Sequence, residues 1–284
     1  KPIHGSTTWC IMRLLQSSRE AQWSAAAYAV NCFIVQTSMF GWYGATNSEL
    51  SRKYQTYVTP AGWAFSIWSY IFLSQLIFTV YTLLSSAPAH CSAVVKAIWL
   101  PWISAQICQV LWTFIFAQDL ILLSLLAMVG IYLSLAVVVY KLLQIERGTK
   151  VFSHSPGTWA LFHLPFLVHF GWISCASLIN VNVVMRAHLF SMESQLAAAV
   201  VTLGCVAISS YSALVLRGEA AHAFVVAWAL YALNSQLKNE SNPLPFDAAK
   251  EPYTKALGTA ALVFCFASLA GGLVCFALNR WAER

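Results

Sequence analysis

Long uninterrupted apolar runs, separated by short polar segments, dominate the chain. Eight of these runs are long enough to cross a hydrocarbon core of about 30 Å as helices. They cover approximately residues 22–43, 61–84, 94–117, 120–143, 158–182, 194–216, 220–237 and 256–278. The runs are continuous, whereas the strands of a membrane barrel alternate apolar and polar residues. The pattern predicts an all-α integral membrane protein with about eight transmembrane helices and both termini on one side.

Polar residues distinguish some of these runs from the others. The first run contains Asn31 and Gln36, and the short seventh run ends in Asn234 and Gln236. The third and fourth runs are separated by almost nothing except Asp119, so a tight helical hairpin is expected there. A proline-rich segment at 238–254 is predicted to be an extended connection exposed to solvent.

Composition supports the membrane assignment. Of the 284 residues, 59% are hydrophobic and only 9% are charged, against about 25% charged in soluble domains. The net charge of +6 is spread over segments that flank the runs, and no basic stripe suits nucleic acid. The eight cysteines form no C-x-x-C pair, so we expect small packing residues and neither a disulfide framework nor a zinc site.

The ends and loops bear on location. Lys and Arg counted by loop give ten on the side of the termini and six on the other, which favours termini in the cytoplasm, matrix or stroma. The first twenty residues are basic, rich in Ser and Thr, and contain one acid, Glu20. They are typical of the remnant of an organellar transit peptide and equally of the start of a truncated chain. An organellar membrane (plastid or mitochondrion) or a bacterial membrane is expected.

Three predicted helices carry large rings and hydrogen-bonding groups at helical spacing. The sets are Phe65, Trp68, Phe72 and Gln75; Ala105, Gln109, Trp112 and Phe116; and His169, Trp172, Ala176 and Asn180. Each set lies on one helical face. Facing one another, these faces would line a pocket for a flat, mostly apolar ligand, with His169 within reach of a central metal. The alternative is helix packing, in which Gln, Asn and His bond to neighbouring helices.

Catalytic patterns are missing from the sequence. No carboxylate pair lies within a run, and no nucleophile-elbow, zinc-protease, P-loop or dinucleotide-binding motif occurs. We therefore predict a protein that is not an enzyme and has no catalytic or structural metal bound by its side chains.

Three blocks resemble, in order, motifs of the TspO/MBR family of tryptophan-rich sensory or translocator proteins. They are Pro60-Ala61-Gly62-Trp63-Ala64-Phe65 followed by Trp68, Gln109-Val110-Leu111-Trp112 followed by Phe116, and Trp172 to Asn180 through Ala176. The chain departs from the family pattern at Ala61, where a second proline is usual, and at Gln109, where asparagine is usual. The resemblance covers about residues 22–186. It divides the chain into an N-terminal soluble segment (1–21), a five-helix core (22–186) and three additional helices (187–284).

The resemblance implies a pocket that binds porphyrins, sterol-like molecules or other apolar ligands, and frequent homodimers. With the helical stripes it gives the predicted ligand-binding residues Trp63, Phe65, Trp68, Gln109, Trp112, Phe116, His169, Trp172 and Asn180. The predicted function is non-catalytic binding of a flat hydrophobic molecule, with porphyrin, chlorophyll, carotenoid or lipid as candidates. One alternative is an accessory subunit of a photosynthetic or respiratory supercomplex that binds pigments or lipids. A third interpretation is a small-molecule transporter.

Overall fold

The computed structural model describes residues 17–84, 89–149, 156–239 and 251–282, which contain ten α-helices and no strand. The helices are α2 (Arg19–Ser38), α3 (Asn47–Lys53), α4 (Ile67–Leu83), α5 (Ala89–Ala117), α6 (Ile121–Thr149), α7 (Pro156–Phe162), α8 (Leu164–Ala187), α9 (Met192–Arg217), α10 (Ala220–Leu237) and α11 (Glu251–Ala282). A 3-10 turn, η1 (Gly62–Ser66), leads directly into α4. The all-α prediction is confirmed for this part of the chain. Most of the predicted N-terminal segment (1–21) and of the proline-rich loop (238–254) lies outside the described residues.

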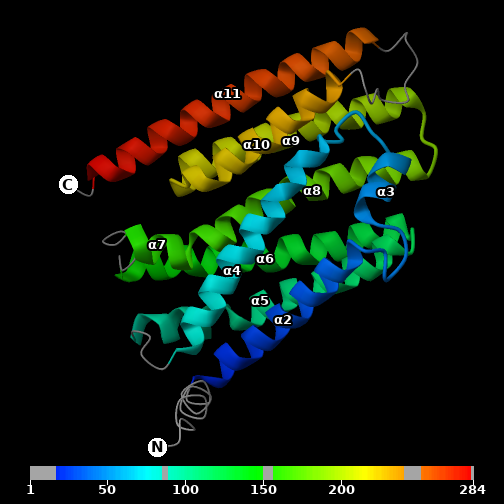
Figure 1. The fold of residues 1–284 in the computed structure, drawn as a ribbon. Coiled ribbons are helices and arrows are strands. Elements are labelled where there is room, and N and C mark those ends of the chain that lie inside the picture. The colour runs from blue at the N-terminus through cyan, green and yellow to red at the C-terminus, as the bar shows by residue number, and fades with distance from the viewer. Residues whose placement is uncertain (1–16, 85–88, 150–155, 240–250, 283–284) are drawn as a thin grey trace, which may run out of the picture.

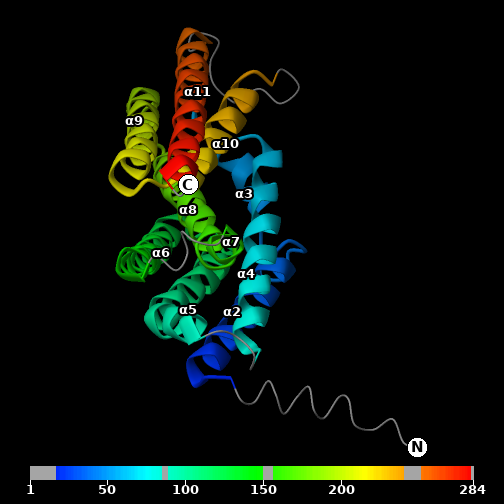
Figure 2. The same cartoon turned by 90° about the vertical axis from the view of Figure 1, so that its left-hand side faces the viewer.

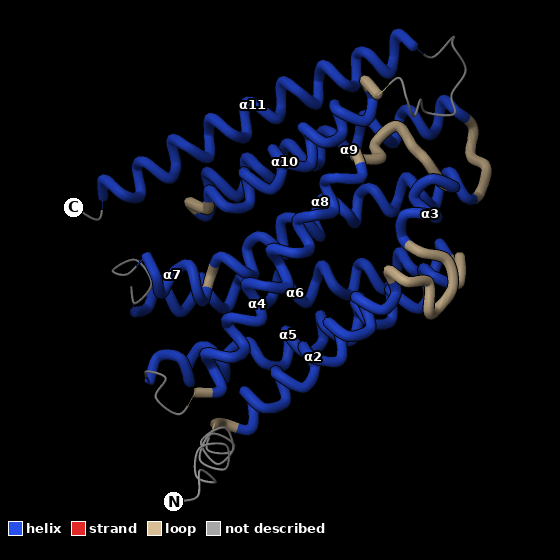
Figure 3. The backbone as a smooth tube through the Cα atoms, viewed as in Figure 1, coloured by secondary structure: helices blue, strands red, loops and turns tan. Residues whose placement is uncertain are grey.

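The long helices run side by side in one bundle (Figure 1). Helices α9, α10 and α11 form one side of the bundle, α2 and α5 lie on the other side, and α8 lies between them (Figures 1 and 2). Helix α4 crosses α8 obliquely, and the two helices are in contact. The start of α2 and the end of α11 lie at the same end of the bundle (Figure 1). The expectation that both termini lie on one side of a membrane stays a prediction. Most of the described loops lie at the opposite end, beside α3 (Figure 3).

Within the part of the chain that the structure describes, six helical segments, and not eight, are long and apolar enough to cross a membrane. They are Gly62–Leu83, Cys91–Ala117, Ile121–Thr149, Leu164–Ala187, Met192–Arg217 and Pro252–Asn279. The predicted first and seventh spans became α2 and α10, which fall outside this set. Both carry polar residues that the bundle buries, Asn31 in α2 and Asn234 in α10. A helix that places its polar side chains against other helices does not need the uniformly apolar composition of a helix that faces lipid on all sides. This polarity lowers their hydropathy and explains the difference.

One hydrophobic cluster joins α4 and α8 to the three C-terminal helices. It contains Ile71 of α4, Trp172 of α8, Leu203 of α9, Val226 of α10 and Ala261 of α11, all buried. A second cluster, around Trp102 and Phe166, joins α8 to α2, α4, α5, α6 and α7. Helix α8 therefore contributes to both clusters. The three C-terminal helices share a core with α8 and α4.

The predicted fifth span is interrupted at its start. Helix α7 ends at Phe162, and α8 begins at Leu164 with Pro165 in its first turn. A proline inside a continuous helix would leave the carbonyl four residues earlier without its donor and would crowd it. In the first turn of a new helix its missing N–H has no helical partner to lose. The interruption at His163 therefore follows from Pro165.

The predicted hairpin between the third and fourth spans is present. Helix α5 ends at Ala117, α6 begins at Ile121, and Asp119 adopts a left-handed conformation with φ of 62°. Aspartate tolerates this region better than most residues with a Cβ. The tight turn brings the end of α5 against the connection between α2 and α4. There the Ala45 N–H donates to the Ala117 carbonyl over 2.9 Å.

Candidate functional site

The stripe on α4 meets α8 inside the bundle. The Gln75 Nε2 lies 2.9 Å from His169 Nδ1, and the Trp68 ring lies edge-on to the His169 ring with centroids 5.5 Å apart. His169 is buried, and its Nε2 has no hydrogen-bond partner among the described residues. With the Gln75 amide as donor, Nδ1 accepts and Nε2 carries the proton. His169 therefore joins α4 to α8 here, and its role as an axial metal ligand stays a prediction.

Rings at the entry to α4 contact both α8 and α10. Phe65 lies edge-on to the buried Trp172, with centroids 5.7 Å apart. Trp63 lies edge-on to Trp228 of α10, with centroids 4.8 Å apart. The Trp228 Nε1–H donates to the Ala64 carbonyl over 3.0 Å. The Pro-x-Gly-Trp segment is therefore bound on one side to the expected helix α8 and on the other to α10, which lies beyond the predicted five-helix core.

A second group of predicted residues lies between α5, α6 and α8. Trp112 stacks on Phe116 with centroids 4.7 Å apart, and its Nε1–H donates to the Asn180 Oδ1 over 3.4 Å. The Asn180 Nδ2 donates in turn to the Ser124 hydroxyl over 3.4 Å. These long hydrogen bonds join three helices. Asn180 thus holds the hairpin of α5 and α6 against α8.

Gln109 takes part in a buried amide cluster between α5 and α2. The Asn31 Nδ2 donates to the Gln109 Oε1 over 3.1 Å and also to the Gln106 Oε1. All three side chains are buried. The Asn31 Oδ1 and the Gln106 Nε2 have no partner among the described residues. This cluster pairs the buried Asn31 of α2 with two side chains of α5 and positions α2 on that helix.

The nine predicted residues are thus brought into the bundle, but not around one open space. Trp172 is 1% exposed, and Trp68 and Trp112 both pack against the cluster that contains Leu135 and Ile173. None of the three cavities given below is lined by any of the nine. Trp63 and Phe65 are 40% and 38% exposed, and the other seven side chains fill space between helices, as the packing interpretation expects. Ligand binding by these residues stays a prediction.

A larger apolar space lies on the adjacent face of α4. This α4–α10 cavity has a volume of about 520 Å³. It is lined by Ser66, Ile67, Tyr70, Trp159, Leu164, Val168, Ala220, Ala221, Phe224, Val225, Trp228 and Phe276. Five of these side chains are aromatic, and they come from α4, α7, α10 and α11. The lining contains no acidic or basic side chain.

The wall of the α4–α10 cavity is built from contacts between helices. Phe224 lies so close to α11 that a Cβ at Gly272 would be 2.6 Å from its Cε1. On the other side of α10, a Cβ at Gly171 would be 3.1 Å from the Val225 Cβ. These glycines let α10 approach α11 and α8 closely, which fixes the positions of Phe224 and Val225. Trp228 is held by its bond to Ala64.

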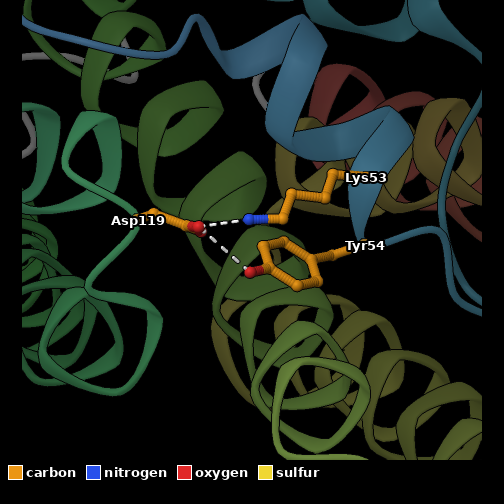
Figure 4. Close-up of polar contacts among 3 residues, drawn as sticks. All are labelled: Lys53, Tyr54 and Asp119. Atoms are coloured by element: carbon orange, nitrogen blue, oxygen red, sulfur yellow. Dashed lines mark hydrogen bonds and ion pairs between the residues drawn. The ribbon is translucent and has the colours of Figure 1, made fainter.

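A polar corner lies at the end of the bundle that α3 occupies. Lys53 forms an ion pair with Asp119, and the Tyr54 hydroxyl donates to the same Asp119 oxygen over 3.2 Å (Figure 4). Hydrogen bonding to Asp119 raises the pKa of Lys53. A cavity of about 310 Å³ beside Asp119 is bordered by Tyr54, Leu120 and His188. The corner attaches α3 to the hairpin of α5 and α6 and contains too few buried polar groups to indicate a chemical site.

Within the described residues, no group of three His, Cys, Asp or Glu side chains is close enough to hold a metal ion. The described cysteines also form no disulfide with one another. The expectation that the protein is not an enzyme and lacks a metal centre stays a prediction.

Sequence reasoning missed the residues that line the α4–α10 cavity. Tyr70 occupies the stripe of α4 next to the predicted one, and Trp159 belongs to the short α7. Phe224 and Trp228 belong to α10, which the family motifs did not cover. The spacing of Ala220, Ala221, Phe224, Val225 and Trp228 at i, i+1, i+4, i+5 and i+8 was the available signal, because it places them on one helical face.

A family model described as TSPO-like protein matches residues 22–272. This match continues through α9 and α10 and into α11, beyond residue 186, where the resemblance in the motifs ended. No curated protein and no solved structure matches the chain.

Proposed function

We propose that this chain, which belongs to the TSPO-like protein family, binds a flat and mostly apolar molecule in the α4–α10 cavity. The chain is an integral membrane protein by its family and its helix composition. The observation that carries the proposal is the cavity itself, with about 520 Å³ of space beside five aromatic side chains. Ligand pockets in proteins typically enclose about 300–1,000 Å³ and are lined by apolar and aromatic groups.

The lining favours a flat ligand. Rings of Tyr70, Trp159, Phe224 and Trp228 can stack on or meet the edge of a conjugated ring system. Each such aromatic contact contributes roughly 0.5–1.5 kcal/mol beyond burial. The polar groups of the lining are the Ser66 and Tyr70 hydroxyls and the Trp159 indole N–H, besides the Trp228 N–H that is already bonded to Ala64. A tetrapyrrole has this combination of a broad apolar face and a few polar substituents, so we propose it as the ligand class.

The same lining supports binding without turnover. General acid–base catalysis needs a titratable group within hydrogen-bond reach of the reacting atom. The α4–α10 cavity has no Asp, Glu, His, Lys or Cys in its lining, and its one titratable side chain, Tyr70, has no second titratable group in the lining with which to form an acid–base pair. We therefore propose that the ligand is held or delivered unchanged.

The proposal is tested by titrating the purified protein with protoporphyrin IX and following the absorption of the porphyrin. Phe224→Ala removes one ring from the cavity and should raise the Kd about tenfold, because a lost ring contact with its burial costs roughly 1.5 kcal/mol. The matched control is Phe33→Ala, since Phe33 is 59% exposed on α2 and does not line the cavity. Its Kd should equal that of the wild type.

Two results would contradict the proposal. Equal Kd values for Phe224→Ala and Phe33→Ala would show that the porphyrin does not occupy the α4–α10 cavity. An absence of saturable binding by the wild type would favour the accessory-subunit interpretation, in which the aromatic residues pack against neighbouring subunits and their pigments.

A further inference from the structure

A second apolar space adjoins the α4–α10 cavity. This α4–α7 groove has a volume of about 400 Å³ and is lined by Tyr70, Leu73, Ser74, Ile77, Gly157, Ala160, Leu161 and Leu164. Tyr70 and Leu164 also line the α4–α10 cavity. The two spaces therefore meet at these two side chains, one from α4 and one from α8.

The groove and the cavity follow one face of α4. The lining residues of this helix and of the turn before it are Ser66, Ile67, Tyr70, Leu73, Ser74 and Ile77, and this spacing forms one helical stripe. From Ser66 to Ile77 the stripe extends about 16 Å, at about 1.5 Å per residue. The predicted stripe, with Trp68, lies on another face and packs into the core. The combined space is thus long and follows the helix axis.

Small residues on α7 leave room for the groove. Gly157 and Ala160 lie one turn apart and face α4 with little or no side chain. Leu161 and Leu164 continue the same stripe across the interruption at His163. Leu73 and Ile77 are 59% and 53% exposed, so the groove is open toward the surrounding lipid along its length. Its walls are aliphatic apart from Ser74 and from Tyr70 at the junction, so it suits an alkyl chain better than a second ring system.

The groove presents almost no hydrogen-bonding group to an occupant. The Ser74 hydroxyl already donates to the Ile71 carbonyl over 3.1 Å. Apart from Ser74 and the Tyr70 hydroxyl at the junction, the lining side chains are aliphatic or absent. A buried polar substituent would have to lose its hydrogen bonds there, at a cost that an alkyl chain does not incur.

We infer that the ligand of this protein carries a long alkyl or isoprenoid chain, which lies in the α4–α7 groove while its flat head occupies the α4–α10 cavity. The inference rests on the proposed function and specifies its ligand as a tailed amphiphile. Lipid tails surround the groove and are as apolar as its walls. Binding of the ligand's alkyl chain is therefore stabilised by packing contacts and not by transfer out of water. The tail should therefore select among ligands and orient the head.

A matched pair of metal-free tetrapyrroles tests this assignment in the full-length protein in lipid nanodiscs. Methyl pheophorbide a and pheophytin a share one macrocycle and differ in a methyl or a phytyl ester. Ala160→Phe places a ring in the groove. This substitution should raise the Kd of pheophytin a at least fivefold while changing the Kd of methyl pheophorbide a by less than twofold.

The control variant is Ala197→Phe, because Ala197 is likewise exposed on a helix but lies on α9, away from both spaces. It should leave both Kd values unchanged. Retained binding of methyl pheophorbide a by Ala160→Phe shows that the variant is folded. Equal changes for both pigments in Ala160→Phe, or no change for either, would overturn the tail assignment and leave the proposed function standing. Failure of both pigments to bind the wild type would overturn both proposals.

Discussion

The indole of Trp63 lies edge-on to that of Trp228, with ring centroids 4.8 Å apart and an interplanar angle of 88°. Trp63 belongs to the motif that opens α4, and Trp228 belongs to α10. The neighbouring hydrogen bond from Trp228 to Ala64 strengthens the same junction. A motif recognised in the N-terminal half therefore has its main partner in the C-terminal half, which agrees with a family match that extends to residue 272.

This junction should contribute measurably to stability. Trp228→Ala removes a ring contact and a hydrogen bond, and should lower the free energy of unfolding by about 2–3 kcal/mol. Combining it with Trp63→Ala in a double-mutant cycle should give a coupling of roughly 0.5–1.5 kcal/mol. Unfolding by SDS in mixed micelles measures both. The control is Trp23→Ala, since Trp23 is 63% exposed. A coupling near zero would mean that the two rings are merely adjacent.

The amide cluster on α2 gives a second prediction. Asn31→Ala leaves the buried Gln106 and Gln109 oxygens without their donor, which should cost about 1–3 kcal/mol of unfolding free energy. Replacing all three, as Asn31→Leu with Gln106→Leu and Gln109→Leu, removes the unpaired groups and should recover most of that loss. The same SDS titration compares the variants. A triple variant as unstable as Asn31→Ala would show that the cost is loss of packing.

The loop before α3 depends on one glycine. Gly44 has φ of +132°, and a Cβ there would lie 2.4 Å from the Ala117 oxygen. Gly44→Ala should therefore separate the loop from the α5 terminus and lower the midpoint of thermal unfolding by several degrees. Gly62→Ala is the matched control, because a Cβ at Gly62 would meet nothing within 4 Å. Equal midpoints for the two variants would contradict this account of the loop.

Stability should fall with rising pH because of Glu219. Burial raises the pKa of this carboxyl to about 7, and Glu146 raises it further while Arg217 opposes the shift. Between pH 4.5 and 7 the unfolded carboxyl is ionised while the folded one keeps its proton, so folding takes up a proton and the folded state loses stability as pH rises. Below pH 4.5 Glu219 is protonated in both states and does not change the stability with pH. Above pH 7 it is ionised in both states, and the loss of stability that it causes is complete.

Glu219→Gln should remove that part of the pH dependence, measured as the thermal unfolding midpoint from pH 4.5 to 8. Glu49 should contribute to the pH dependence of stability with the opposite sign, and Glu49→Gln should remove that contribution. Hydrogen bonds from the Thr46 backbone and side chain lower the pKa of Glu49, so its contribution is present above the unfolded pKa and is lost as pH falls. An unchanged pH profile in Glu219→Gln would show that this carboxyl is solvated in the folded protein.

The sequence predicted the helices well because apolar runs and helical spacing are local properties. The hairpin at Asp119 and the inward direction of Trp68, Trp112 and Trp172 followed from them. The sequence could not show whether the aromatic side chains on α4, α5 and α8 leave a pocket between these helices or fill the space. That depends on the distances between helices, which contacts such as Val225 on Gly171 determine.

Two other features depended on context that a pattern does not contain. The sequence pattern predicted transmembrane spans at α2 and α10 although each contains a polar residue, Asn31 or Asn234. A run of apolar residues does not show which face of a helix packs against protein. Asn234 donates to the Gly258 carbonyl of α11 over 2.6 Å, a contact between two helices that no local pattern indicates. The cavity residues on α10 were missed because the recognised motifs ended before that helix.

The central claim is that the ligand lies between α4, α7, α10 and α11, beside Phe224 and Trp228. A crystal structure of the protein grown from a lipid phase with protoporphyrin IX tests it most directly. The account predicts density for the macrocycle in the α4–α10 cavity, with Trp68, Trp112 and Trp172 packed as they are now. Density for the macrocycle among Trp68, Trp112 and Trp172, with the α4–α10 cavity filled by lipid alone, would contradict it.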